Sequence, residues 1–214
     1  MTHHSAALIL CCLAILPGAS AATILNPSFE QPVTSSFTYD PLDPTLGWTF
    51  SGRTGVAINT FFTPPPPDGN QAAFIQQASD QPTSLSSITQ SLAGVALTPS
   101  QLVFFLAQRP DHSVNPINVS YGSQNLGTFT PASTTFQQIT INFTPLATSG
   151  VLTFRSAATT GGDLNSALDL VSFTQATSVP EPASAILILP FLAALVLFRR
   201  HRGKRFVDAS ANFS

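Results

Sequence analysis

Apolar and polar residues alternate along most of the central part of the chain, in short runs that end at turn residues. Within Phe136–Phe143, Ile139, Ile141 and Phe143 fall on one face and the intervening polar residues on the other. A period of two residues is typical of a strand with one buried face. Nine runs are predicted as strands: Gly55–Asn59, Ala72–Gln77, Ser84–Leu92, Gln101–Gln108, Ile117–Tyr121, Gln124–Thr128, Phe136–Phe143, Gly150–Arg155 and Ala167–Gln175.

The spacing of these runs predicts the fold class. The strands recur about every 8–15 residues, and no amphipathic helix of useful length lies between them. A proline-rich segment, 63–70, is predicted as a stiff loop closed by a turn. Many short strands with turn signals between them favour an all-β protein. We therefore expect a two-sheet antiparallel jelly-roll sandwich over residues 22–178.

The N-terminal 21 residues differ from this pattern. An apolar run, 6–16, is followed by a helix-breaking Pro17-Gly18 and by the small residues of 19–21. This order predicts a secretory signal peptide over residues 1–21. Cys11 and Cys12, the two cysteines of the chain, both lie inside it. The mature protein is therefore expected to contain no disulfide, no thiolate metal site and no cysteine nucleophile.

A second uncharged apolar run, Ala183–Phe198, lies near the C-terminus. As a helix its sixteen residues would span about 24 Å, somewhat less than the ~30 Å hydrocarbon core of a bilayer. A basic cluster, 199–205, follows it and predicts a cytoplasmic end, with the body outside. We expect a transmembrane helix at 183–198, with a buried core helix as the alternative. The basic residues are Arg199, Arg200, Arg202, Lys204 and Arg205, and residues 206–214 form a short tail.

The charge of the body narrows its possible partners. Residues 23–178 carry three arginines and no lysine against seven aspartates and Glu30, a net charge of about −5. Phosphate backbones are bound by clustered Lys and Arg, so the composition argues against a nucleic-acid partner. A surface dominated by Ser, Thr, Asn and Gln favours an extracellular β-protein.

The C-terminal segment 179–205 also resembles a known sorting signal. Val179, Pro180, Glu181 and Pro182 precede the apolar run and the basic cluster. This order is similar to the PEP-CTERM signal of Gram-negative bacteria that make exopolysaccharide. The resemblance implies that a membrane-embedded exosortase recognises the motif and cuts near it. It also implies export through the inner membrane, a temporary hold there, and a final place at the cell surface or in the extracellular matrix.

The body resembles a second family. Leu25-Asn26-Pro27-Ser28-Phe29-Glu30, Gly47-Trp48-Thr49, Asp68-Gly69-Asn70-Gln71 and the final strand with Asp169 occur in an order similar to galactose-binding-like jelly rolls, which include carbohydrate-binding modules. The resemblance implies a structural calcium ion held by Glu30 and Asp169, with backbone carbonyls near 68–71. The alternative is that Glu30 accepts backbone or arginine hydrogen bonds and that Asp169 caps a strand end. No other cofactor is expected.

Trp48 is a candidate platform for a sugar ring, and Tyr39, Phe61, Phe62 and Tyr121 are alternative platforms. Trp48 follows a glycine at the start of the predicted sandwich, and Phe61 and Phe62 precede the proline-rich loop. An exposed aromatic face can stack on a pyranose ring. The alternatives are a core position for Trp48 and a hydrophobic plug beneath the loop for Phe61 and Phe62.

Candidate catalytic residues are few. His112 lies between Asp111 and Ser113, but members of a catalytic triad meet in space and not as consecutive loop residues. Asp40 and Asp43 could form a glycosidase pair, yet each directly precedes a proline, a setting typical of turns with local backbone hydrogen bonds. We therefore expect a non-enzymatic envelope or matrix protein, with a carbohydrate-binding module as the alternative and a surface hydrolase third.

Overall fold

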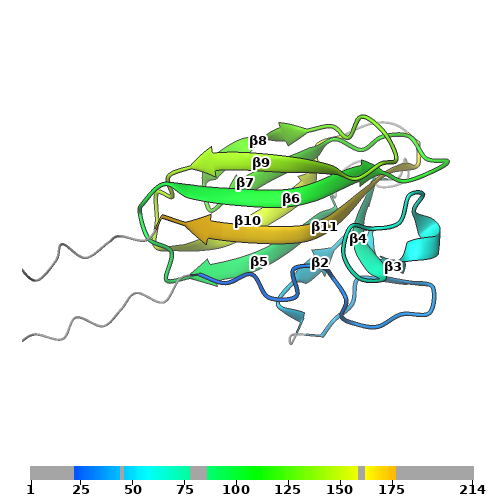
Figure 1. Ribbon diagram of the computed structural model, residues 1–214, viewed down its shortest axis with the longest axis horizontal. Helices are drawn as coiled ribbons and strands as arrows, with labels where there is room; N and C mark the ends of the chain where they lie inside the picture. The colour runs from blue at the N-terminus through cyan, green and yellow to red at the C-terminus, as the bar shows by residue number, and fades with distance from the viewer. Residues whose placement is uncertain (1–21, 44–45, 78–85, 159–161, 177–214) are drawn as a thin grey trace, which may run out of the picture. The chain divides into compact units, whose positions relative to one another are not determined.

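The computed structural model describes residues 22–43, 46–77, 86–158 and 162–176, and these form a β-sandwich (Figure 1). A short 3-10 helix, η2 (Asn59–Phe61), follows the third strand. The strands are β1 (Phe37–Tyr39), β2 (Thr49–Ser51), β3 (Thr54–Ile58), β4 (Gln71–Gln77), β5 (Ser87–Ala93), β6 (Ser100–Gln108), β7 (Ile117–Tyr121), β8 (Gln124–Phe129), β9 (Gln137–Phe143), β10 (Ser149–Ser156) and β11 (Leu164–Gln175).

The strands form two antiparallel sheets. The six-stranded sheet has the order β1-β3-β4-β11-β6-β9, and the five-stranded sheet has the order β2-β5-β10-β7-β8. In Figure 1, β9, β6 and β11 lie in front of β8, β7 and β5. This arrangement confirms the predicted two-sheet jelly-roll sandwich. The sequence pattern did not reveal β1 and β2, because strands of three residues are too short to display an alternation.

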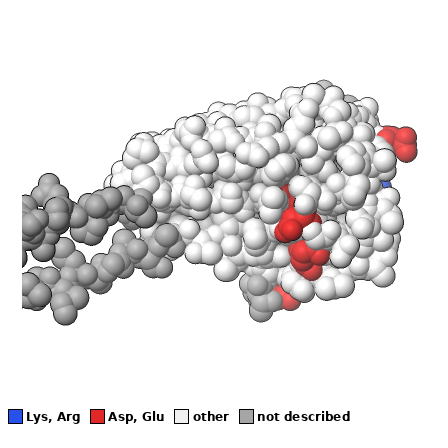
Figure 2. Space-filling model, viewed as in Figure 1, with Lys and Arg blue, Asp and Glu red and all other residues white. Residues whose placement is uncertain are grey.

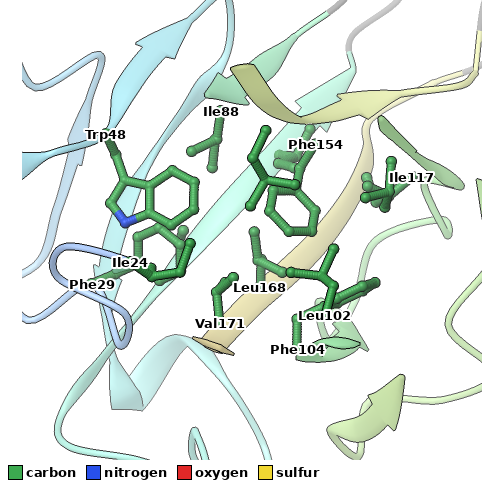
Figure 3. Packing of buried hydrophobic residues seen from close by; sticks show 14 of the residues in the cluster. Ile24, Phe29, Trp48, Ile88, Leu102, Phe104, Ile117, Phe154, Leu168 and Val171 are labelled. Atoms are coloured by element: carbon green, nitrogen blue, oxygen red, sulfur yellow. The ribbon is translucent and has the colours of Figure 1, made fainter. Parts of the chain in front are cut away.

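The main core fills the space between the two sheets (Figure 3). Alternation places Leu102, Phe104 and Leu106 of β6 on the inner face of the six-stranded sheet, and Leu152 and Phe154 of β10 face them from the five-stranded sheet. Such a core has a thickness of about 10 Å between the facing sheets. The alternation seen in the sequence therefore corresponds to real burial on this face.

Trp48 belongs to this core. It is only 3% exposed, its ring lies 5.1 Å from that of Phe29, and its Nε1 donates a 2.9 Å hydrogen bond to the carbonyl oxygen of Asn26. Figure 3 places both rings beside Ile24. The indole cannot stack on a ligand from this position, so the sugar-platform hypothesis is wrong for Trp48 and its alternative, a core position, describes it.

A second cluster covers part of the outer face of the six-stranded sheet. Four alanines, Ala57, Ala72, Ala107 and Ala167, come from four neighbouring strands and pack with Phe62 and Phe74. Small side chains leave room above the sheet, and the aromatic rings occupy it. As a result β4 is buried along its whole length, glutamines included.

The terminal segments fall outside the described residues. These are the predicted signal peptide 1–21, the sorting segment 179–205 and the tail 206–214. In the part of the chain that the structure describes, no helix has the length and apolarity needed to cross a membrane. The boundaries predicted for these segments therefore stay predictions.

Candidate functional site

A pocket of about 260 Å³ opens on the outer face of the six-stranded sheet, next to the alanine-rich cluster. Its lining comes from six separate stretches of the chain, which meet where β6 ends and β11 begins. The lining residues are Phe37, Tyr39, Ala57, Phe61, Phe62, Phe74, Gln76, Arg109, His112 and Asp163.

One wall of the pocket is aromatic. The ring of Phe37 meets those of Tyr39 and Phe61 edge to face, both at 5.6 Å between centroids. Tyr39 meets Phe74 in the same way at 5.1 Å. Edge-to-face packing is the favoured arrangement for such rings and fixes their orientation. Phe37 and Tyr39 remain exposed, so the wall offers aromatic surface to a ligand.

The adjoining wall is polar. The Nε2 atom of His112 lies 3.2 Å from Oδ2 of Asp163, and the side-chain amide of Gln76 donates a hydrogen bond to the same carboxylate. The Tyr39 hydroxyl donates to Oε1 of Gln76 at 2.5 Å, which links the two walls. The guanidinium carbon of Arg109 lies 5.2 Å from the centroid of Phe61, within the range of a cation–π contact. Hydrogen-bond donors and acceptors therefore lie beside exposed rings.

His112 takes its acidic partner from a distant part of the chain. Asp163 precedes β11, whereas Asp111 is the sequence neighbour considered in the triad hypothesis. The Nδ1 atom of His112 lies 2.8 Å from the carbonyl oxygen of Pro110, a group that can only accept, so Nδ1 carries a proton. The imidazole is thus held between two acceptors. This geometry fixes the orientation of the imidazole at the pocket and engages both of its nitrogen atoms within the protein.

Asn165 of β11 is the cross-strand neighbour of Gln76 of β4 and was not predicted from the sequence. Its backbone carbonyl oxygen accepts from the backbone N–H of Arg109 at 3.2 Å. The side chain is fully buried, and neither atom of its amide has a hydrogen-bond partner. Leaving such a group unpaired costs about 1–3 kcal/mol, so buried amides are normally satisfied. No local sequence signal distinguishes this asparagine from others in the chain.

Phe61 and Phe62 have different environments. Phe62 is 4% exposed and packs against Phe136 at 5.9 Å, so it is the hydrophobic plug of the alternative hypothesis. Phe61 is partly buried and lies at the pocket between Phe37 and Arg109. Only Phe61 therefore stays a candidate for ligand contact.

Of the two aspartates considered as a glycosidase pair, Asp40 adopts a positive φ of 43°, and its backbone N–H donates to the carbonyl oxygen of Thr54.

The two residues expected to hold calcium lie in a separate acidic cluster. Glu30, Asp68 and Asp169 form it beside the connection between β3 and β4, where Figure 2 shows acidic atoms on an otherwise nearly uncharged face. Asp169 is fully buried, and this burial raises the pKa of its carboxyl to about 7. The negative charges of Asp68 and Glu30 raise that pKa further, while hydrogen bonds from the backbone N–H groups of Leu170 and Asp68 oppose the rise.

The donors around this cluster come from the chain itself. Oε1 of Glu30 accepts the backbone N–H groups of Asn70 and Gln71 at 2.9 and 2.8 Å. Ser28 Oγ donates to Asp68 at 2.5 Å, and the N–H of Asp68 donates to Asp169 at 3.2 Å. The expected carbonyl ligands near 68–71 are thus replaced by N–H donors that face the carboxylates. Within the described ranges, no group of three or more His, Cys, Asp and Glu side chains is arranged to hold a metal ion.

Comparison with known proteins identifies the fold and assigns the chain to no family. No family model matches the chain, and no curated protein matches it. Several solved structures share the sandwich at low identity. A cyclase from Fischerella sp. TAU, in complex with 4-(1H-indol-3-yl)butan-2-one, matches with a TM-score of 0.54 and 15% identity, over 74% of this chain and 100% of the cyclase.

Two further structures have a TM-score of 0.50. One is the CBM22-1 xylan-binding domain of Xyn10C from Paenibacillus barcinonensis, at 14% identity over 75% of this chain and 99% of that domain. The other is the K2 cleaved adhesin domain of Lys-gingipain, at 10% identity over 70% of this chain and 97% of that domain. At these identities the similarity establishes a shared fold. The protein is therefore a jelly-roll β-sandwich of the kind found in carbohydrate-binding modules.

Proposed function

We propose that the sandwich domain binds carbohydrate, and that the aromatic pocket is its binding site. The observation that carries this proposal is the pairing of exposed Phe37 and Tyr39 with the polar wall of Gln76, Arg109 and Asp163. The similarity in fold to a xylan-binding domain supports it. Sites for small ligands are mostly apolar, with a few polar groups that set orientation.

The chemistry of the pocket suits a sugar. The face of a pyranose ring carries C–H groups that pack on an aromatic ring, and its rim carries hydroxyl groups that both donate and accept. In this pocket Arg109 supplies donors, Asp163 supplies acceptors and Gln76 supplies both. Because the pocket holds only about 260 Å³, we propose that it takes one or two sugar units of a longer chain.

Affinity gels containing different polysaccharides would test this proposal on the full chain in detergent. We expect retardation by at least one polysaccharide, and a loss of affinity of about tenfold, or ~1.4 kcal/mol, for Tyr39→Ala. Leu42→Ala is the matched control, because Leu42 is exposed and lies outside the pocket. Absence of retardation on every polysaccharide would instead favour a structural matrix protein without a specific ligand.

We propose that the domain is non-catalytic. His112 donates to a backbone carbonyl through Nδ1 and faces Asp163 through Nε2, so both ring nitrogens are engaged in holding the mouth of the pocket. This favours a binding role over the surface-hydrolase alternative. Incubation with each polysaccharide that binds, followed by an assay for new reducing ends, would test it: release of reducing ends that His112→Ala abolishes would establish a hydrolase.

We further propose that the acidic cluster binds one structural calcium ion. The proposal rests on the resemblance to galactose-binding-like domains, which selects Glu30 and Asp169; their carboxylate oxygens are the hard ligands that calcium prefers, and binding would replace the backbone N–H groups that now face them. A divalent cation would also offset the mutual repulsion of three neighbouring carboxylates, one of them fully buried. Its role would be to fix the β3–β4 connection against β11.

The proposal for location rests on the order of motifs at the C-terminus. We propose that residues 179–205 act as a PEP-CTERM signal, so that an exosortase recognises Pro180-Glu181-Pro182 while the helix 183–198 holds the chain in the inner membrane. Replacing these three residues with alanine in the native host tests it. We expect uncleaved, membrane-retained protein. Unchanged processing and location would reduce the segment to a simple membrane span.

A further inference from the structure

The strand directions give the sandwich two distinct ends. Ser100, at the start of β6, pairs with Phe143 at the end of β9 and with Gln175 at the end of β11. The chain leaves the domain here, where the N–H of Ala176 donates to Pro99 at 3.0 Å. We call this the exit end. It comprises the connections 94–99, 122–123 and 144–148 and the strand residues next to them.

The exit end carries no charged side chain. Every Asp, Glu and Arg of the described residues lies in another part of the domain, and Figure 2 shows that the acidic atoms of the viewed face gather away from the exit end. These charged residues are Glu30, Asp40, Asp43, Arg53, Asp68, Arg109, Asp111, Arg155, Asp163 and Asp169. With three arginines against seven acids, the described domain has a net charge of −4, all of it away from the exit end.

Apolar side chains project from the same end. Leu97 in the β5–β6 connection is 54% exposed, and Leu146 in the β9–β10 connection is 73% exposed. Val151, near the start of β10, is also exposed. Exposed leucines occur singly on many soluble surfaces. Here they occur on adjacent loops of an uncharged end, a composition that suits the boundary between water and lipid.

The chain length between the domain and the apolar run limits their separation. Six residues, 177–182, separate Ala176 from the predicted membrane segment that starts at Ala183. At no more than about 3.6 Å per residue, the seven steps from Ala176 to Ala183 reach at most ~25 Å. If residues 183–198 hold the chain in a membrane, the exit end must therefore remain within this distance of the bilayer.

We propose that the exit end is a membrane-contacting surface, with Leu97 and Leu146 inserted among the lipid headgroups while the chain is held. This inference rests on the membrane hold proposed above. Apolar side chains gain free energy at the bilayer interface, and a surface without charges avoids the cost of desolvating them. The contact also keeps the acidic residues away from anionic lipids, which would repel them.

The same orientation would direct the pocket outward. Arg109 follows the end of β6 and Asp163 precedes β11, so both lie at the end of the sandwich opposite to the exit end. A polysaccharide could therefore reach the pocket while the exit end stays on the lipid. The two proposals use different surfaces and can fail independently.

Site-specific fluorescence on the full chain would test the contact. Single cysteines replace Leu97, Leu146 or Leu42 in a chain whose Cys11 and Cys12 are changed to serine, and each carries an environment-sensitive dye. Leu42 is the matched control, because it is 88% exposed but lies between Asp40 and Asp43. The chain is reconstituted into vesicles of phosphatidylcholine and phosphatidylglycerol that contain headgroup-level spin-labelled lipid.

We expect a blue-shifted emission and strong quenching by the spin label at positions 97 and 146, and neither at position 42. Flotation of the vesicles separates the possible failures. If the chain floats with the vesicles but positions 97 and 146 behave like position 42, the membrane contact is refuted and the hold stands. If the chain does not float, both the hold and the contact are refuted, whereas the carbohydrate proposal is unaffected.

Discussion

The backbone N–H of Asp68 donates a 3.2 Å hydrogen bond to the carboxylate of Asp169, a residue 101 positions later in the chain. This bond joins the proline-rich β3–β4 connection to the last strand. It also brings two acids, together with Glu30, into one cluster around a fully buried carboxyl group. The stability of the domain should therefore respond to both pH and cations.

The first prediction concerns pH in the presence of a chelator. Because the pKa of Asp169 rises from 3.8 to about 7 on folding, the folded state holds its proton more tightly than the unfolded state. The stabilisation by the neutral carboxyl is complete below pH 4 and is lost as pH rises from 4 to 7. At ~1.4 kcal/mol per pKa unit, the loss is on the order of 4 kcal/mol.

Urea unfolding between pH 4 and 7.5 measures this loss. Asp169→Asn is the control, since an amide preserves the shape and does not titrate. We expect the free energy of unfolding of the variant to depend less on pH than that of the wild type. Parallel curves for the two proteins would refute the assignment of the effect to Asp169.

The second prediction concerns calcium. At pH 7.5, where Asp169 is increasingly ionised, calcium at one hundred times its dissociation constant should stabilise the domain by about 2.7 kcal/mol, because it binds only the folded state. Differential scanning calorimetry with calcium and then with chelator measures the shift in Tm. Asp169→Asn and Glu30→Gln should abolish it. A Tm that does not move in the wild type would remove the proposed site.

The third prediction concerns Gly69. Its φ is +66°, and a Cβ atom there would lie 2.3 Å from Oε1 of Glu30. Gly69→Ala should therefore combine backbone strain with a clash that displaces the Glu30 carboxylate. Gly122 is a matched control, with φ +55° and open space around its Cα. We expect Gly122→Ala to cost about 1 kcal/mol from strain alone and Gly69→Ala clearly more. Equal losses in urea unfolding would contradict a role for Glu30 here.

The fourth prediction separates stability from binding at two adjacent phenylalanines. Phe62→Ala removes a buried ring that packs on Phe136 and should cost about 3–5 kcal/mol of unfolding free energy. Phe61→Ala removes a partly exposed ring at the pocket and should cost much less stability. It should instead lower polysaccharide affinity about tenfold, or ~1.4 kcal/mol. Thermal melts and affinity gels on the same two variants measure both effects, and a reversed pattern would rule out the proposed pocket.

Much of the sandwich follows from local sequence patterns. The nine predicted strands correspond to β3–β11, because each has a period of two long enough to be recognised. β4 is the instructive exception: Ala72 on its outer face is as fully buried as Ala73 on its inner face, because the outer face packs with Phe62. Its outer face is covered by residues from a neighbouring loop, which no pattern within β4 records.

The candidate site was only partly predictable. Resemblance to galactose-binding-like domains selected Glu30 and Asp169, and the structure brings them into one cluster with Asp68. Phe61 was identified as a loop aromatic, whereas Phe37, Gln76, Asp163 and the buried Asn165 gave no local signal. The partner of His112 is 51 residues away, beyond the reach of any motif.

By itself, the sequence determined nine of the strands, the sandwich class and the low charge content of the body, because these depend on periodicity and composition within short segments. The tertiary structure decided which aromatic residues are buried, which acids meet, and where the pocket and the uncharged exit end lie. These properties depend on the pairing of strands far apart in the chain. That pairing is set by the packing of the whole core, so Trp48 and Phe61, both candidate sugar platforms in the sequence, differ completely in their surroundings.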